Sequence, residues 1–158
     1  MMLRKAGNDR KIGFRGWILL LLFLVMFLPA YLSVGAQCAG FAKAVVKPEL
    51  SPFVHDGNFN ATILGEGERI VLRKTVFDDI KYRLVVKGVP ELPQVRFKLI
   101  DDGGDILFDN ADHDFTSKWD FDVQTTRSLS VEITVPEDDD ESSDKGGCVA
   151  ILFGIERE

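Results

Sequence analysis

The sequence predicts an all-β protein, an antiparallel, jelly-roll-like β-sandwich of about eight strands, preceded by an apolar signal or anchor helix at the N-terminus. Two observations predict the sandwich. Short segments in which apolar and polar residues alternate recur from residue 58 onward, with turn-forming residues between them. No convincing long helix is visible in that region. A third observation, the composition of residues 1–36, predicts the export segment.

The first 36 residues have the three-part layout of a secretory signal peptide. Five Lys and Arg residues and one acid, Asp9, lie in the first 16 positions, and a run of 12 apolar residues extends from Trp17 to Leu28. Val34 and Ala36 are the small residues expected before a cleavage site, which we therefore place after Ala36.

Two alternatives to cleavage are open. The uncharged stretch from Gly16 to Ala42 is long enough to cross a bilayer, which corresponds to retention as an inner-membrane anchor with its basic start in the cytoplasm. Lipidation of Cys38 is disfavoured, because Gln37 precedes it in place of Gly, Ala or Ser. Pro29 ends the strong apolar run and favours cleavage. In each case the chain is expected in the periplasm or at the cell surface.

We expect three parts: the signal peptide or anchor of residues 1–36, an N-terminal arm of residues 37–57, and a β-sandwich of residues 58–158. Removing residues 1–36 leaves 14 basic and 24 acidic residues, a formal charge of −10. Repulsion between phosphates and so acidic a domain argues against any general affinity for nucleic acid.

The two cysteines, Cys38 and Cys148, lie near the two ends of the expected mature chain. An even number of cysteines in an exported chain predicts a disulfide, which would tie the N-terminal arm to the last strand. Closing so long a loop stabilises a fold by about 4–5 kcal/mol on the chain-entropy model. The alternatives are two buried free thiols, or a metal site, although no histidine or second cysteine lies near either residue.

The elements follow in order along the mature chain. Residues 38–47 are expected to form a short helix or an extended arm that Pro48 and Pro52 end. The expected strands are residues 59–64, 68–76, 81–87, 95–99, 106–108, 119–123, 129–135 and 148–155. The last strand is so apolar that it should be central in its sheet. Most aromatic residues fall on inward positions and are expected in the core: Phe97, Phe108, Trp119, Phe121 and Phe153.

No catalytic or cofactor motif stands out, so we predict that the protein is not an enzyme. Nucleophilic catalysis needs a base beside the nucleophile, and the two histidines, His55 and His113, lie in polar loops outside any recognisable motif. No glycine-rich phosphate loop and no zinc-ligand spacing occur.

Clustered carboxylates form the best candidate site, a calcium site, although no cofactor is required by the sequence. Calcium takes oxygen ligands, which the following residues could supply: Asp101, Asp102, Asp105, Asp109, Asp112 and Asp114. Asn110, Asp112 and Asp114 have the spacing that begins an EF-hand loop. The match then fails, because Phe115 and Phe121 stand where that loop needs glycine and a bidentate glutamate. The alternative is that these acids sit in solvated hairpin turns.

Charge is unevenly distributed along the chain. Eight basic residues and three acids lie between Arg69 and Lys98, whereas 15 acids and two basic residues lie between Asp101 and Asp144. One interpretation is a dipolar domain that steers a charged partner. The other is that the basic residues lie on outward strand faces and pair with acids across the sheet.

Residues 68–72, 81–86, 95–103 and 128–135 follow a recognisable rhythm: a Tyr-containing strand, a strand that ends in an Asp and Gly turn, then an aromatic strand. In this rhythm residues 66–155 resemble the bacterial pre-peptidase C-terminal type of β-sandwich. The resemblance implies a non-catalytic domain.

A second resemblance is carried by short pieces spread over residues 38–154: Cys38, Phe41-Ala42-Lys43, His55-Asp56-Gly57, Asn60-Ala61, Gly65-Glu66-Gly67, Tyr82-Arg83-Leu84, Trp119-Asp120-Phe121 and Gly147-Cys148-Val149. In these pieces the chain is similar to small exported proteins of Bacteroidota without an assigned activity. The resemblance implies a bacterial envelope location, supports the Cys38–Cys148 bridge, and supplies no chemistry.

These observations together predict a non-catalytic envelope protein whose sandwich binds another protein or a glycan of unknown identity. If the N-terminal segment is uncleaved, it would also contact the membrane. The competing class is a calcium- or carbohydrate-binding, lectin-like module. Sugar sites usually expose an aromatic platform, whereas Trp119, the only tryptophan after the signal, alternates as a core residue.

Overall fold

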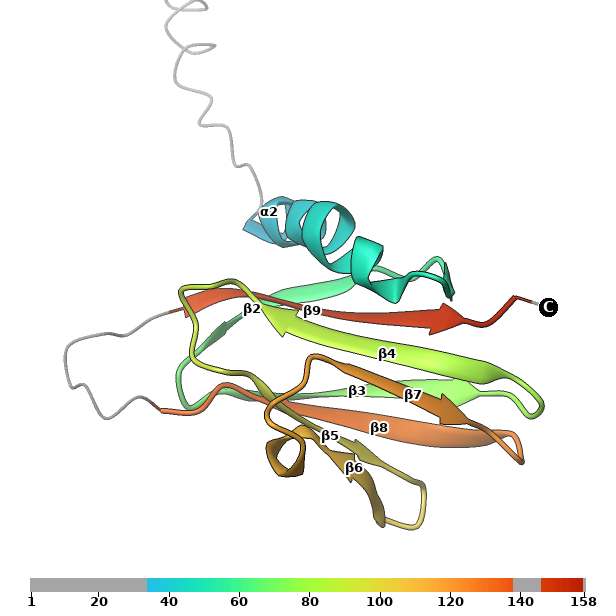
Figure 1. Ribbon diagram of the computed structural model, residues 1–158. Helices are drawn as coiled ribbons and strands as arrows, with labels where there is room; N and C mark the ends of the chain where they lie inside the picture. The colour runs from blue at the N-terminus through green and yellow to red at the C-terminus, as the bar shows by residue number, and fades with distance from the viewer. Residues whose placement is uncertain (1–33, 138–145, 158) are drawn as a thin grey trace, which may run out of the picture. The chain divides into compact units, whose positions relative to one another are not determined.

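A computed structural model describes residues 34–137 and 146–157, which form two antiparallel β-sheets packed face to face (Figure 1). The prediction of a β-sandwich is therefore confirmed. In the described part of the chain, no helix has the length and apolar character needed to cross a membrane. Nearly all of the predicted signal or anchor, residues 1–33, and most of the acidic loop, residues 138–145, lie outside the described residues.

The described residues contain nine strands, and eight of them coincide with the predicted ones within a few residues. Their bounds are β1 (Val54–His55), β2 (Asn60–Gly65), β3 (Arg69–Val76), β4 (Lys81–Gly88), β5 (Arg96–Ile100), β6 (Ile106–Asp109), β7 (Lys118–Asp122), β8 (Arg127–Thr134) and β9 (Gly146–Ile155). In the first sheet β1 and β2 pair with one side of β9, whose other side pairs with β4, and β4 pairs with β7. The second sheet has the order β3-β8-β5-β6. Without the short β1, these are the strand orders of a jelly roll.

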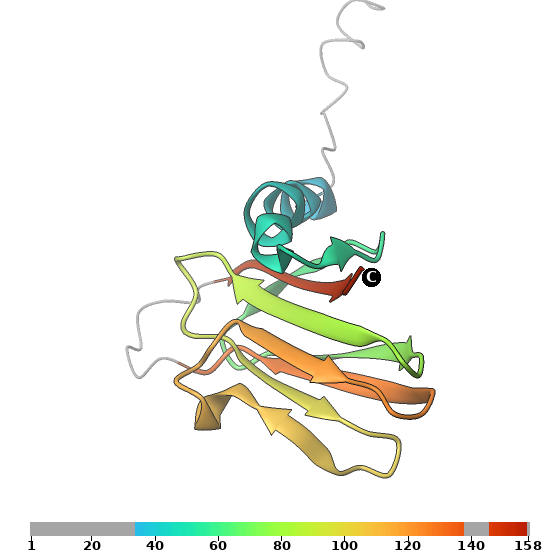
Figure 2. The same ribbon diagram turned by 45° about the vertical axis from the view of Figure 1, so that its right-hand side comes forward.

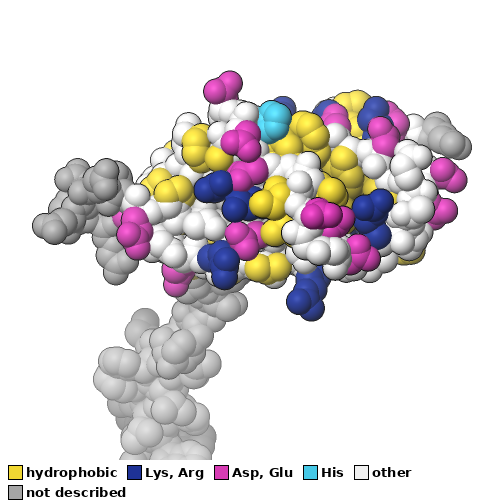
Figure 3. Space-filling view, turned by 90° about the horizontal axis from the view of Figure 1, so that it is seen from below, with side chains coloured by type: hydrophobic (Ala, Val, Ile, Leu, Met, Phe, Trp, Pro, Cys, Tyr) yellow, Lys and Arg dark blue, Asp and Glu magenta, His cyan; other side chains and the backbone are white. Residues whose placement is uncertain are grey.

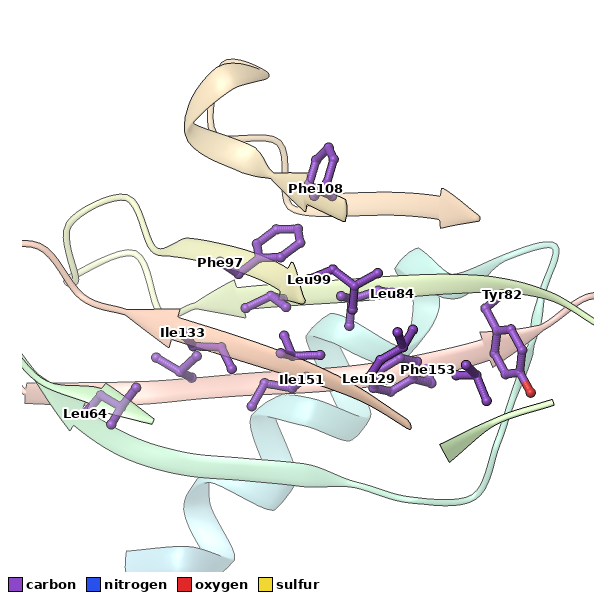
Figure 4. Packing of buried hydrophobic residues seen from close by; sticks show 14 of the residues in the cluster. Leu64, Tyr82, Leu84, Phe97, Leu99, Phe108, Leu129, Ile133, Ile151 and Phe153 are labelled. Carbon is purple, nitrogen blue, oxygen red and sulfur yellow. The ribbon is translucent and has the colours of Figure 1, made fainter. Parts of the chain in front are cut away.

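The main core lies between the two sheets and follows the period-two alternation of the strands. On β8, Leu129, Val131 and Ile133 are each at most 1% exposed, whereas the residues between them reach the outer face. Figure 4 shows side chains from both sheets in this layer, including Phe97 of β5 and Phe153 of β9. The predicted core aromatics all belong to it: Phe97, Phe108 and Phe153 are buried, and Trp119 and Phe121 are partly buried against them.

A helical segment covers the outer face of the first sheet (Figures 1 and 2). It consists of α2 (Val34–Phe41), the π-helical turn η1 (Ala42–Val46) and the 3-10 turn η2 (Lys47–Leu50). A second, smaller core lies between this segment and the sheet, formed by Ala42, Val46, Leu50, Val85, Ala150 and Leu152. Strand β9 is therefore buried on both faces, which explains its nearly unbroken apolar sequence and confirms its predicted central position.

The structure corrects the expected end of the helical segment. The sequence predicts that Pro48 and Pro52 end the segment after residue 47, but Pro48 lies in the first turn of η2, and the helical structure continues to Leu50, two residues before Pro52. A proline is tolerated there because the missing N–H is one that a first turn leaves unpaired in any case.

The predicted disulfide is present, and it joins α2 to β9. Cys38 and Cys148 are bonded, with their Cα atoms 5.2 Å apart. Polar contacts fix the other end of the segment, because Lys87 of β4 pairs with Glu49 and the Arg83 guanidinium donates to the carbonyl of Ser51 at 2.6 Å. The helical segment is thus fastened to the first sheet at both ends.

Candidate partner-binding surface

The outer face of the second sheet is not covered by any helix in the described chain (Figure 1). We call it the exposed sheet face and define it by the outward-pointing residues of the four strands: Arg69, Val71, Arg73 and Thr75 of β3; Ser128, Ser130, Glu132 and Thr134 of β8; Arg96, Lys98 and Ile100 of β5; and Ile106 and Asp109 of β6. Figure 3 views this face and shows basic side chains interleaved with acidic and apolar ones.

Strand register sets these residues in rows across the sheet. One row runs from Val71 through Glu132 and Lys98 to Asp109, and is mixed in charge. The next row runs from Arg73 through Ser130 and Ile100 to Ile106. Apolar and basic side chains thus adjoin on this face. Arginine and exposed apolar side chains are residue types that protein interfaces use.

Ion pairs hold most of the charged side chains of the exposed sheet face in place. The Arg96 guanidinium donates to both carboxylate oxygens of Asp109, at 3.1 and 2.5 Å, and Arg69 lies 3.1 Å from Glu132. Hydrogen bonds from Arg96 lower the pKa of the Asp109 carboxyl below its usual value, although partial burial opposes the shift. Arg73 forms no ion pair with any residue that the structure describes.

The loop from β6 to β7, which borders the exposed sheet face, is held by one buried amide. Asn110, in the 3-10 turn η3 (Asn110–Asp112), is 1% exposed. Its Oδ1 accepts from the backbone N–H of Phe97 at 2.8 Å, and its Nδ2 donates to the carbonyls of Val95 and Thr116 at 3.0 and 3.2 Å. In the sequence Asn110 stands out only by its spacing to Asp112 and Asp114, and nothing there indicates this buried role.

The carboxylates of the predicted calcium ligands do not come together at one site. Asp101 Oδ1 accepts from the backbone N–H groups of Gly103 and Asp105, both at 2.9 Å, and so shapes the β5–β6 turn. Asp109 is committed to Arg96. The other predicted ligands are exposed: Asp102, Asp105, Asp112 and Asp114. Within residues 34–137 and 146–157, no three acidic, His or Cys residues form a group that could hold a metal ion. The calcium site stays a prediction.

The two histidines occupy different settings. The N–H of Gly57 donates to His55 Nδ1 at 3.2 Å, and His55 Nε2 lies 3.1 Å from the carbonyl oxygen of Asn58, so the backbone occupies both ring nitrogens. The ring of His113 stacks on that of Phe108, with centroids 4.7 Å apart. In the described residues neither imidazole is hydrogen-bonded to a hydroxyl group.

The basic segment of the sequence does not form a separate charged pole. Seven of its eight basic residues are ion-paired: Arg69–Glu132, Lys74–Asp56, Lys81–Glu156, Arg83–Asp120, Lys87–Glu49, Arg96–Asp109 and Lys98–Asp109. These pairs are spread over both sheets. The structure therefore favours the interpretation of outward residues paired with acids over the dipolar one.

An apolar cleft of about 290 Å³ opens between the edge strands β6 and β7. We define the apolar cleft by its apolar lining, which is Leu99, Leu107, Trp119, Phe121, Val123 and Leu129. One face of the Trp119 ring is occupied, because it stacks on Phe108 with centroids 4.0 Å apart. Leu107 and its neighbour Ile106 remain 46% and 56% exposed. The cleft lies at the side of the sandwich and is distinct from the exposed sheet face.

Fold and surface define a class: an antiparallel β-sandwich with one sheet covered by a disulfide-bonded helical segment and the other sheet open. No family model matches the sequence, and no curated protein matches it. Among solved structures, the chain is similar to Aeromonas hydrophila PliG, a periplasmic lysozyme inhibitor of g-type lysozyme. The match has a TM-score of 0.48 and 8% identity and covers 66% of this chain and 89% of that one. Inhibition of lysozyme is a property of that protein.

Proposed function

We propose that this chain is a non-catalytic, exported binding protein that recognises an acidic surface of a partner protein through the exposed sheet face. The observation that carries the proposal is that the helical segment covers one sheet and not the other. The central part of the outer face of the first sheet, on β4 and β9, is buried under the helical segment, whereas the outer face of the second sheet, with Val71, Arg73 and Ile106 well exposed, is left open.

Charge supports an acidic partner. The exposed sheet face carries four basic and two acidic side chains, while the whole chain has a formal charge of −6. A locally positive face on an acidic protein favours encounter with negative surfaces and disfavours other orientations. Arg73, which has no acidic partner among the described residues, is available to pair with a partner's carboxylate.

Export is supported by the disulfide. Such bonds persist in oxidising compartments and are rare in the cytosol, and Cys38–Cys148 joins elements 110 residues apart in the sequence. Together with the predicted signal or anchor, this supports a location in the periplasm or at the cell surface.

The test is position-specific photo-crosslinking in the native host. A crosslinking amino acid is placed at Val71 of the exposed sheet face or, as the matched control, at Ile63 of β2; the two side chains are 52% and 43% exposed. We expect Val71, and not Ile63, to capture one distinct protein. The capture should be lost in an Arg73→Glu background and kept in a Lys47→Glu background, where the changed residue lies on the helical segment. Equal capture from both positions, or none from Val71, would overturn the proposal.

The lectin-like alternative has less geometric support, because stacking on Phe108 leaves only part of the Trp119 ring available to a sugar. A purified glycan that changes Trp119 fluorescence, and whose binding is unaffected by Arg73→Glu, would favour that alternative.

A further inference from the structure

We propose that the protein forms a symmetric dimer in which β7 pairs antiparallel with β7 of a second copy, centred on Asp120. In the described chain β7 is the edge strand of the first sheet and pairs only with β4. Its outward residues, Lys118, Asp120 and Asp122, are exposed. The inference is independent of the proposed function, because the interface would lie at the side of the sandwich and leave the exposed sheet face open.

The backbone of β7 has the groups that such pairing needs. The N–H of Val86 donates to the carbonyl of Ser117 at 2.9 Å, which sets the alternation of the β4–β7 ladder. Residues 119 and 121 then bond to β4, and the N–H and C=O groups of residues 118, 120 and 122 point away from it. In an antiparallel pair centred on Asp120, these groups meet the same groups of the second copy. At Lys118 the pairing would replace two long contacts with the Thr116 hydroxyl, whose oxygen lies 3.4 Å from the Lys118 nitrogen and 3.3 Å from its carbonyl oxygen.

Side chains are self-complementary in the same register. Lys118 of each copy stands opposite Asp122 of the other, and on the inward face Trp119 stands opposite Phe121. Opposite charges and paired aromatic rings are favourable cross-strand neighbours. A shift of the register by two residues toward the C-terminus places Asp120 opposite Asp122, which is repulsive. A shift by two residues the other way places Lys118 opposite Asp120, which is favourable, but it also brings Thr116 opposite Asp122. Both backbone groups of Thr116 are already bonded, its N–H to the carbonyl of His113 at 3.0 Å and its carbonyl to Asn110 Nδ2 at 3.2 Å. Charge thus disfavours the first shift, and the occupied backbone groups of Thr116 disfavour the second.

The two Asp120 carboxylates would face each other at the symmetry axis, and each already has a counter-charge. The Arg83 guanidinium donates Nε to Asp120 Oδ1 at 2.7 Å and Nη2 to Oδ2 at 2.6 Å. This two-point pair balances the carboxylate within its own chain. The like-charge contact at the axis is therefore offset by two arginines.

The apolar cleft gives a second reason for a copy at this side. Leu107 of β6 and Trp119 of β7 line the same cleft, so both sheet edges open onto it. Ile106 and Leu107 are adjacent exposed apolar residues on an edge strand, an arrangement that promotes association when it is left uncovered. Pairing through β7 brings the second copy beside this edge and covers Leu107 in the cleft, while Ile106 stays open on the exposed sheet face.

Charge reversal tests the register. The chain, recovered from a host that exports it, is studied by sedimentation velocity over a concentration series, with circular dichroism to confirm folding. Lys118→Asp alone and Asp122→Lys alone each place like charges opposite one another, and each should weaken the dimer on the order of tenfold or more. The double variant Lys118→Asp/Asp122→Lys exchanges the two charges and should restore dimerisation. Lys47→Asp on the exposed helical segment is the control for Lys118→Asp, since both change the net charge by the same amount.

Several results would overturn the dimer. The first is that the unmodified chain sediments as a monomer at every concentration. A dimer that neither single reversal weakens is another, because it must use a different surface. Failure of the folded double variant to regain the affinity lost by the single variants would exclude the Asp120-centred register.

Discussion

The amide of Asn110 serves backbone groups from two parts of the chain, β5 with its preceding connector and the loop before β7. Because the side chain is 1% exposed, water cannot replace it without opening the fold. Each buried polar group left without a partner costs about 1–3 kcal/mol. Asn110 therefore stabilises the fold, although neither its position in a loop nor its residue type predicts this.

We expect Asn110→Ala to lower the free energy of unfolding by about 3 kcal/mol, measured by urea denaturation. Asp112→Ala is the matched control, since Asp112 is exposed in the same 3-10 turn and its loss should change stability by less than about 0.5 kcal/mol. Equal effects of the two variants would contradict the assignment.

Among single residues, the sequence predicted the bonded cysteines and most core aromatics. Two cysteines in an exported chain are expected to form a disulfide, and the alternation of apolar and polar residues along a strand indicates which aromatic side chains are buried. It missed Asn110, because a polar residue within a polar loop carries no sign of burial. It predicted the inward direction of Trp119 but not the stacking on Phe108, which depends on how the two sheet edges meet.

At the level of elements, β9 depends on glycine where the connector between β4 and β5 crosses it. A Cβ atom at Gly147 would lie 2.5 Å from Val89 Cγ2 and 3.0 Å from Leu92 Cγ. Val89 cannot move aside easily, since its N–H is bonded to the carbonyl of Cys148 at 2.9 Å and its side chain is stiff.

Gly147→Ala should therefore lower the free energy of unfolding by about 1–3 kcal/mol through overpacking. The matched control is Gly146→Ala on the same strand, where the nearest described atom would be 3.9 Å from the new Cβ and the change should stay within about 0.5 kcal/mol. Thermal or urea melts of the two variants measure the difference; indistinguishable melts would refute the close-packing argument.

Eight strands were predictable because most of them alternate over several residues and β9 is a continuous apolar run, whereas β1 was missed because two residues, Val54 and His55, are too few to show a period. The helical segment runs past Pro48 because proline is compatible with a first turn. The sequence did not predict which strand the helical segment covers. The apolar run of β9 indicates burial on both faces, but it does not show whether a second sheet or a helix covers each face. For that reason the exposed sheet face emerged only from the structure.

Over the whole molecule, three lowered carboxyl pKa values link the fold to pH. The hydrogen bonds from Arg96 and Arg83 lower the pKa of Asp109 and Asp120. Burial opposes the shift at Asp56, but hydrogen bonds from Lys74 and Asn58 outweigh it and the pKa is lowered there too. A carboxyl with a lower pKa in the folded state stabilises the fold above its unfolded pKa, and this contribution disappears as the pH falls through the folded pKa.

The midpoint of thermal unfolding should therefore be nearly constant from pH 7 to about pH 5 and fall below about pH 4, where unfolded Asp residues take up protons. Asp109→Asn should lower the midpoint at pH 7 and reduce the loss on acidification. Asp102→Asn, in the exposed β5–β6 turn, should reproduce the unmodified profile. An identical acid transition in the Asp109 variant would show that its ion pair does not contribute.

The bridge from Cys38 to Cys148 also decides how the domain bears mechanical load. Tension applied to the chain ahead of Cys38 passes through the sulfur atoms into β9, which has strand partners along both sides. When the other end of the force is applied elsewhere in the sandwich, it loads both ladders of β9 instead of peeling the helical segment away turn by turn. A chemically reduced chain would yield first at the helical segment, and its unfolding under force would be faster.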